Sequence, residues 1–319
     1  MTWKISLMIV LLLFLGSCKN DRNRHTDTES AVVQDYLTSE CLLEADVLLS
    51  NPKGLDVKFI DFRKREDYQK SHLPGAINIW RNDIEDSMYP YRGMMASKNT
   101  IEALFSELGI QNTDTLIVYD NHSGSDAARL WWVLQNYDFG AVKLLNGGIT
   151  AWISAGGEVT DEISEFPSSK FTLPAHSSMK YLIGLEGLKQ ELVKKNPPLL
   201  LDVRTHDEYT GKRQKSGASR AGRIPNSQWI DWAHAIDYHG SGKFRSTKEL
   251  EALYGQLGIS KEDPIITYCH TGVRSAHTTF VLTELLGYTK VKNYDGSWTE
   301  WSYFEDLPIG KDSITLTLQ

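Results

Sequence analysis

The sequence repeats itself, and this internal repeat constrains the possible fold more than any other feature. The same 26-residue interval separates Asp120 from Asn146 in the first half and Cys269 from Asp295 in the second. Four segments recur in the same order in both halves: Val57–Arg63 with Leu199–Arg204, Leu104–Ile110 with Leu253–Ile259, Thr115–Asp120 with Pro264–Cys269, and Asn146–Trp152 with Asp295–Trp301. Two unrelated halves would not keep this order and spacing by chance, so the sequence indicates a duplication.

Each half alternates short apolar runs with amphipathic stretches of helical period. This alternation predicts an α/β fold in which a parallel sheet carries helices on both faces. The 319 residues are enough for two such domains, which we place at residues 36–161 and 179–310. Residues 162–178 contain two prolines and no helical period, so we expect a linker there, and residues 311–319 form a C-terminal tail.

The first 18 residues differ from the rest of the chain. Lys4 precedes an apolar run, Ile5–Leu15, that is too short to be a good membrane span and is typical of a secretory signal. The run ends in Leu-Gly-Ser-Cys at Cys18, which resembles the lipobox of bacterial lipoproteins. The resemblance implies an exported protein, lipidated at Cys18 and held at a periplasmic or cell-surface membrane face by its lipid alone. An uncleaved anchor or an ordinary signal peptide is the alternative.

Charge and cysteine content restrict the remaining possibilities. Residues 19–35 are polar and charged and predict a flexible tether. Lys and Arg number 34 against 41 Asp and Glu, a net charge of −7, so no nucleic-acid partner is expected. With Cys18 lipidated, only Cys41 and Cys269 remain, and no cysteine metal site is indicated. We interpret Cys41 as a buried packing residue, with a Cys41–Cys269 disulfide left open.

One loop in the second half is the candidate site of chemistry. Ile265–Tyr268 is a β-branched apolar run typical of a buried strand, and Ser275–Leu286 has helical periodicity. Cys269 lies between them, at the carboxyl end of the strand, where parallel sheets bind ligands. Helix amides and a nearby cation such as Arg274 lower a thiol pKa and favour the thiolate. The helix is expected to bury Phe280, Leu282 and Leu285.

Several motifs in order then resemble one family, the tandem rhodaneses, which are two-domain sulfurtransferases. In the second half the motifs are YCHTGVRSAH at Tyr268–His277, LDVR at Leu201–Arg204, GRIPNS at Gly222–Ser227 and YDGSWTEW at Tyr294–Trp301. HLPGA and NGGITAW of the first half match the family's N-terminal domain, and the resemblance spans about Leu42–Leu307. It implies two tandem rhodanese-like domains, of which only the second is catalytic. Asp120 aligns with Cys269, and because a carboxylate cannot accept sulfane sulfur, the first domain should be chemically silent.

The resemblance implies a two-step sulfur transfer without a cofactor or metal. The Cys269 thiolate attacks the outer sulfur of thiosulfate, sulfite leaves, and cyanide or a thiol takes the sulfur from the cysteine persulfide. Arg274 is expected to bind the anionic donor, and Arg204 has this role by its position in the family motif. The loop residues expected to hold the persulfide through backbone N–H groups are His270, Thr271, Gly272 and Val273.

Alternatives remain for the two arginines and for the donor. Arg204 could instead pair with Asp202 or Asp207, and Arg274 could face solvent. Thr271 stands where thiosulfate-specific members commonly carry a cation, and the loop does not complete the pattern of 3-mercaptopyruvate-specific members either. Arg274 favours thiosulfate because a dianion gains more from a guanidinium than a monoanionic keto acid does. 3-Mercaptopyruvate is the alternative donor.

Two further classes of function compete with this one. Cysteine-dependent phosphatases also place an arginine at a helix start, but with a C-x5-R spacing, whereas Cys269 and Arg274 give the tighter C-x4-R. A membrane-anchored persulfide carrier or docking module, which hands sulfur to a partner with little turnover of its own, is the second alternative.

Overall fold

The computed structural model of the chain describes residues 39–50 and 57–312. The signal segment, Cys18, the tether and most of the C-terminal tail therefore lie outside the described residues. Within them, no helix is both long and apolar enough to cross a membrane. The described residues belong to one compact unit.

The first half forms a five-stranded parallel sheet with strand order β1-β5-β4-β2-β3. Its strands are β1 (Leu42–Leu43), β2 (Val57–Asp61), β3 (Ile77–Asn78), β4 (Thr115–Tyr119) and β5 (Val142–Leu145). Its helices are η1 (Ser39–Cys41), α1 (Ala45–Ser50), α2 (Arg65–Lys70), η2 (Arg81–Ile84), α3 (Lys98–Glu107), α4 (Ala127–Asn136) and α5 (Gly148–Ser154).

The second half repeats this arrangement with strand order β6-β10-β9-β7-β8, again all parallel. Its strands are β6 (Leu182–Ile183), β7 (Leu199–Asp202), β8 (Gln228–Trp229), β9 (Ile265–Tyr268) and β10 (Val291–Tyr294). Its helices are α6 (Leu185–Leu192), α7 (His206–Thr210), η3 (Trp232–Ala235), α8 (Thr247–Gly255), α9 (Val273–Phe280), the π-helical turn η4 (Val281–Leu285) and α10 (Ser297–Tyr303). The identical strand orders confirm the predicted duplication and the α/β fold.

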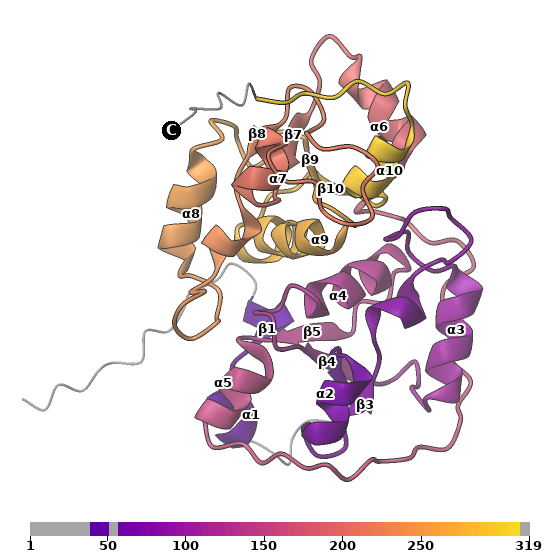
Figure 1. Cartoon of the computed structure of the whole chain (residues 1–319). Coiled ribbons are helices and arrows are strands. Elements are labelled where there is room, and N and C mark those ends of the chain that lie inside the picture. The colour runs from indigo at the N-terminus through magenta and orange to yellow at the C-terminus, as the bar shows by residue number, and fades with distance from the viewer. Residues whose placement is uncertain (1–38, 51–56, 313–319) are drawn as a thin grey trace, which may run out of the picture. The chain divides into compact units, whose positions relative to one another are not determined.

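Helices cover both faces of each sheet because successive strand residues point to opposite faces. In β4, Leu116 and Val118 join the core with α3 and α4, whereas Ile117 and Tyr119 join that with α1, α2 and α5. In the second sheet α8 and α9 pack on one face and α6 and α10 on the other. The α4 and α9 sides share one core, and these helices contact each other (Figure 1).

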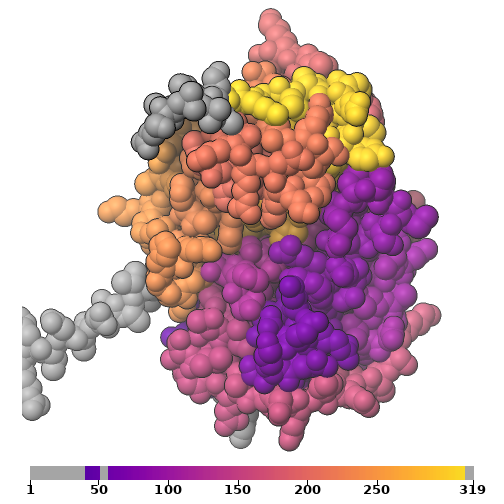
Figure 2. Space-filling view, viewed as in Figure 1, coloured from indigo at the N-terminus to yellow at the C-terminus, as the bar shows by residue number. Residues whose placement is uncertain are grey.

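The predicted linker connects the halves without a helix or strand from residue 161 to residue 178. It is held along α3, because the Phe171 N–H donates to Ser106 Oγ at 2.9 Å and the Leu173 N–H to Glu102 Oε1 at 2.7 Å. On the face shown in Figure 2, atoms of the first half, in indigo to magenta, pack directly against atoms of the second half, in orange and yellow.

Helix α9 begins at Val273, two residues before the predicted start, so Arg274 lies in its first turn. Its first helical bond joins Ala276 to the Gly272 carbonyl, three residues after Cys269, whereas the equivalent bond of the first half joins Ala128 to Gly124, four residues after Asp120. The loop of the second half is thus one residue shorter. Because the interval from Cys269 to Asp295 is still 26 residues, the segment after this loop contains one residue more than its equivalent in the first half. The π-helical turn η4 accommodates that additional residue.

Candidate active site

Cys269 directly follows β9 and is completely buried. The chain then reverses at Gly272, whose φ of +74° lies in the left-handed region. A Cβ atom at this position would lie 2.6 Å from the Asp295 carbonyl oxygen, so glycine is required for its backbone angle and for the close approach. The reversal brings the start of α9 back over the thiol.

The surroundings of the Cys269 thiol lower its pKa. Burial by itself raises the pKa, but the charge of Arg274, the Ser275 hydroxyl, and the N–H groups of Ser275 and Thr271 outweigh burial. The loop therefore favours the thiolate, which is the nucleophilic form of cysteine. Ser275 was not singled out in the sequence, since nothing in the motif distinguishes it from a capping serine.

Arg274 forms a two-pronged ion pair with Glu208 of α7, with Nη1–Oε2 and Nη2–Oε1 distances of 2.8 and 2.9 Å. Burial raises the pKa of a carboxyl, but the ion pair with Arg274 and the charges of Lys215 and Arg204 hold the pKa of Glu208 at about 2. The alternative of a solvent-facing Arg274 is therefore wrong. The guanidinium lies near the thiol, with its charge balanced by a carboxylate.

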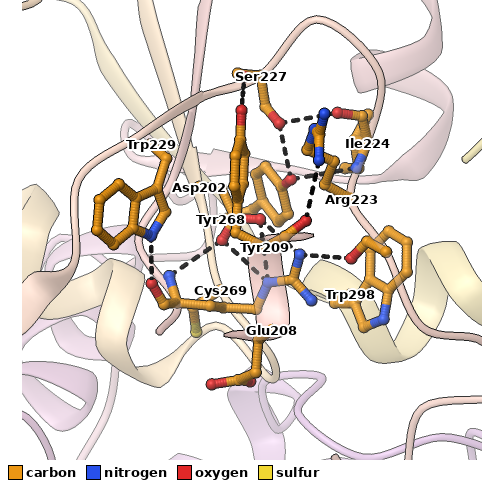
Figure 3. Close-up of polar contacts among 12 residues, drawn as sticks. Asp202, Glu208, Tyr209, Arg223, Ile224, Ser227, Trp229, Tyr268, Cys269 and Trp298 are labelled. Carbon is orange, nitrogen blue, oxygen red and sulfur yellow. Dashed lines mark hydrogen bonds and ion pairs between the residues drawn. The ribbon is translucent and has the colours of Figure 1, made fainter. Parts of the chain in front are cut away.

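Arg204 is almost fully buried and pairs with Asp202, with Nε–Oδ1 at 2.9 Å and Nη2–Oδ2 at 2.5 Å. It also donates to the Gly222 carbonyl at 2.8 Å and lies 4.6 Å from the centre of the Trp298 ring. Figure 3 shows Asp202 and Trp298 in this cluster, close to Cys269. The structure thus places Arg204 in the ion pair that the sequence had left open as the alternative to donor binding.

The first half contains an ion pair equivalent to that of Arg204 and Asp202. Arg63 and Asp61 form the same pair after β2, with Nη2–Oδ2 at 2.6 Å, and Arg63 donates to the Ser71 carbonyl at 2.6 Å. The first domain carries Asp120 in place of the cysteine, so this ion pair is a structural feature that the two halves share.

The other loop residues differ from one another in burial and in contacts. His270 is buried, and its Nε2 lies 2.9 Å from the Ser216 carbonyl. Burial and the charge of Lys215 lower the pKa of His270 to about 4, so its ring is neutral near pH 7 and donates this bond. Val273 is buried, while Thr271 is partly exposed.

A pocket of about 270 Å³ opens beside His270 and Thr271. The first domain contributes Trp80, Arg81, Asn82, Glu85 and Arg92, and the second contributes Lys215, Ser216, Gly217, His270, Thr271 and Thr299. Sequence reasoning missed the residues from the first domain and Lys215, because they belong to no local pattern around the cysteine. Glu208 had a signal, since Thr205-x-x-Glu208 is a capping box that places a carboxylate at the start of α7.

The loop of the first domain holds a carboxylate in its ring of backbone amides. Asp120 accepts four N–H bonds, from His122, Gly124, Asp126 and Ala127, at 2.8 to 2.9 Å. The Asp120 carboxyl group thus occupies the place where a loop of this kind would hold an anion. This supports the prediction that the first domain is chemically silent.

Both described cysteines are free, so the disulfide left open by the sequence does not form. Cys41 is only partly buried and donates from Sγ to Glu284 Oε2 at 3.3 Å, which corrects its interpretation as plain buried packing. Burial and Glu284 raise the pKa of Cys41 to about 12, so this thiol is not nucleophilic. Across residues 39–50 and 57–312, no three His, Cys, Asp or Glu side chains gather in a way that could hold a metal ion.

Comparisons with known proteins identify the family of the chain. The profile of the rhodanese-like domain matches residues 44–155 and 185–303. The chain is 36% identical over 252 residues to the sulfur carrier protein TtuD of Thermus thermophilus, covering 76% of this chain and 87% of the relative. It is 37% identical over 253 residues to a Saccharopolyspora erythraea protein named "Putative thiosulfate sulfurtransferase", covering 76% and 85%.

Solved structures share the fold. Wild-type EanB superposes with a TM-score of 0.72 at 21% identity, covering 86% of this chain and 69% of that one. YnjE superposes with a TM-score of 0.72 at 24% identity, covering 88% and 70%. With one profile match in each half, and relatives above 30% identity, the chain belongs to the rhodanese family as a tandem of two rhodanese-like domains.

Proposed function

We propose that the protein is a thiosulfate sulfurtransferase that works through a persulfide on Cys269. The observation that carries this proposal is a buried thiol of lowered pKa, surrounded by amide donors and a cation, beside a small pocket. Membership of the rhodanese family supports sulfur transfer as the class of reaction. Within that class of reaction, we propose thiosulfate as the sulfur donor.

Both steps balance with thiosulfate as the sulfur donor and cyanide or a thiolate as the acceptor, and neither step needs an oxidant or reductant. The thiolate attacks the outer sulfur of thiosulfate, the S–S bond of the donor breaks, and its electron pair leaves on sulfite. The persulfide anion on Cys269 can accept the N–H bonds of Thr271 and Ser275 that lower the thiol pKa. Cyanide or a thiolate then attacks the terminal sulfur, which returns the Cys269 thiolate.

A carrier role is the second candidate, because the TtuD relative is named a sulfur carrier protein. A carrier would form the persulfide on Cys269 but pass its sulfur on slowly without a partner. 3-Mercaptopyruvate remains the alternative donor, since the pocket has room for a small keto acid and the ion pair with Glu208 balances the charge of Arg274.

The test compares thiosulfate with 3-mercaptopyruvate as donor, using purified tag-free protein that lacks residues 1–35. We expect thiocyanate formation from thiosulfate and cyanide, and the mass of one added sulfur atom on the Cys269 peptide. Cys269→Ser should abolish both, while the matched control Cys41→Ser keeps both. A persulfide that forms without turnover favours the carrier, and phosphate release from an aryl phosphate without thiocyanate would indicate the phosphatase instead.

We also propose that the protein is exported and lipidated at Cys18, on the basis of the lipobox-like Leu-Gly-Ser-Cys. Metabolic labelling of the full chain with a fatty acid tests this. Label should be incorporated in the wild type and lost in Cys18→Ala, and incorporation that survives this change would contradict the proposal.

A further inference from the structure

The cationic groups around the thiol differ in whether a carboxylate balances them. Three arginines lie in or next to the pocket, and each has its own acidic partner: Arg274 with Glu208, Arg81 with Asp126, and Arg92 with Glu85. Each of these charges is therefore largely balanced inside the protein. An anion entering the pocket would have to compete with a carboxylate for each guanidinium.

Lys215 differs from these arginines. Among the contacts of residues 39–50 and 57–312, no hydrogen bond or ion pair involves its ammonium, although the group interacts electrostatically with Cys269, Arg274 and Glu208. Its side chain is exposed and lines the pocket beside Thr271. Lys215 therefore contributes the surplus positive charge next to the nucleophile.

The backbone next to Lys215 is hydrogen-bonded to the loop that follows Cys269. The next residue, Ser216, accepts the bond from His270 Nε2 at 2.9 Å. A Cβ atom at Gly217, where φ is +93°, would lie 3.6 Å from the same nitrogen. Because His270 directly follows Cys269, this hydrogen bond connects the segment with Lys215 to the loop that carries the thiol.

We propose that Lys215 is the residue that binds the anionic end of the sulfur donor, an oxyanion such as the sulfonate group of thiosulfate. The proposal rests on the proposed function and assigns different tasks to two cations. Arg274, paired with Glu208, favours the thiolate form of Cys269, and Lys215 binds the donor charge and then the departing sulfite. Partial desolvation and the neighbouring charge of Arg274 lower the pKa of Lys215, as expected for a cation that gains by receiving an anion.

The test uses three variants in the cyanide assay with thiosulfate. Lys215→Met removes the charge and keeps the length of the side chain, and we expect the KM for thiosulfate to rise about tenfold or more, the usual effect of losing one charge-assisted hydrogen bond. Lys215→Arg retains the charge and should stay within about threefold of wild type. Lys212→Met removes a neighbouring exposed lysine that pairs with Asp207 and should leave KM unchanged. An unchanged KM in Lys215→Met would overturn the proposal.

A second measurement does not depend on sulfur transfer. Iodoacetate and iodoacetamide both alkylate a thiolate, but only iodoacetate is an anion. We expect the ratio of the iodoacetate rate to the iodoacetamide rate at Cys269 to fall several-fold in Lys215→Met and not in Lys212→Met. If the wild type transfers no sulfur, the proposed function fails while this ratio still decides the role of Lys215. A ratio equal to that of wild type excludes Lys215 as an anion-binding residue.

Discussion

Neighbours that the fold places around Cys269 lower the pKa of its thiol. Burial opposes ionisation, and a compact set of donors overcomes that cost: a guanidinium, a hydroxyl and two backbone amides. Arg274 can sit beside the thiol only because Glu208 shares its burial, since an unpaired buried guanidinium would be strongly unfavourable. The ion pair and the thiolate therefore form one electrostatic unit.

The first prediction tests this unit with the double variant Arg274→Met, Glu208→Gln, which removes both charges and leaves neither buried alone. Without Arg274 the pKa of Cys269 should rise, so less thiolate is present at any pH below it. The acid limb of kcat/KM for thiosulfate should then move to higher pH, by about one unit or more. Arg65→Met, at an exposed arginine of α2, is the control. An acid limb at the wild-type pH would mean that Arg274 does not ionise the thiol.

The second prediction concerns stability in acid. The pKa of Glu208 is about 2 in the folded protein, below its ordinary value of 4.5, so its contribution is fully present above pH 4.5 and disappears as pH falls toward 2. The shift corresponds to about 3 kcal/mol. Glu208→Gln should lose less stability than wild type between pH 5 and pH 3, measured as the midpoint of urea unfolding. Parallel curves for the two proteins would contradict the ion-pair assignment.

Individual residues of the site differ in how far the sequence could predict them. Cys269 and Gly272 belong to a local motif, and their placement follows from a strand, a turn and a helix in sequence. The partner of Arg274 could not be predicted, because Glu208 is 66 residues away and meets it only when β7 and β9 pair. Lys215 was missed for the same reason, since an irregular segment carries it to the pocket.

The two equivalent loops show how one element can support or prevent the chemistry. In the second half the ring of amides surrounds a thiol, and in the first half it surrounds the Asp120 carboxylate, which satisfies four N–H groups. In the second half the first helical hydrogen bond comes one residue sooner after the strand, and the π-helical turn η4 recovers the spacing. The sequence did not predict this turn, because Val281–Leu285 has the same apolar composition as an α-helix.

The third prediction is that Asp120 stabilises its loop. Asp120→Ala would leave four buried or partly buried N–H groups without an acceptor, and we expect a loss of about 3 kcal/mol or more in unfolding free energy. Asp120→Asn keeps one oxygen acceptor and should cost less. Urea unfolding at pH 7 measures both, with kcat/KM for thiosulfate expected to stay near wild type in the folded fraction. Equal stability of Asp120→Ala and wild type would be the contrary result.

At the scale of the whole molecule, the first domain packs closely against the second. All ten residues of α4 are buried, including Arg129, because the helix lies between its own sheet and α9. The run AARLWWVLQN, apolar around most of its circumference, is the sequence signal for such a helix. The duplication alone predicted two domains but not this shared core, since the pairing of α4 with α9 is a contact between distant parts of the chain.

Contacts between the halves include the loop that follows Cys269. Arg129 of α4 donates to Asp295 Oδ1 at 2.6 Å and to the Gly272 carbonyl at 3.5 Å. Asp295 also accepts the Met95 N–H at 2.9 Å, and Asn293 donates to the Gly272 carbonyl at 3.0 Å. The position of the loop that follows Cys269 is therefore fixed partly by the domain that has no nucleophile.

The fourth prediction follows from this buried ion pair. Arg129→Met should leave Asp295 as a buried, unpaired charge and cost about 3–5 kcal/mol of unfolding free energy, whereas the double variant Arg129→Met, Asp295→Asn should recover part of that loss. Lys189→Met breaks the exposed pair with Glu186 and should cost less than about 1 kcal/mol. Because Arg129 also contacts Gly272, kcat should fall in the double variant even where stability returns. If kcat and stability both return to wild type, the first domain stabilises the second without positioning its loop.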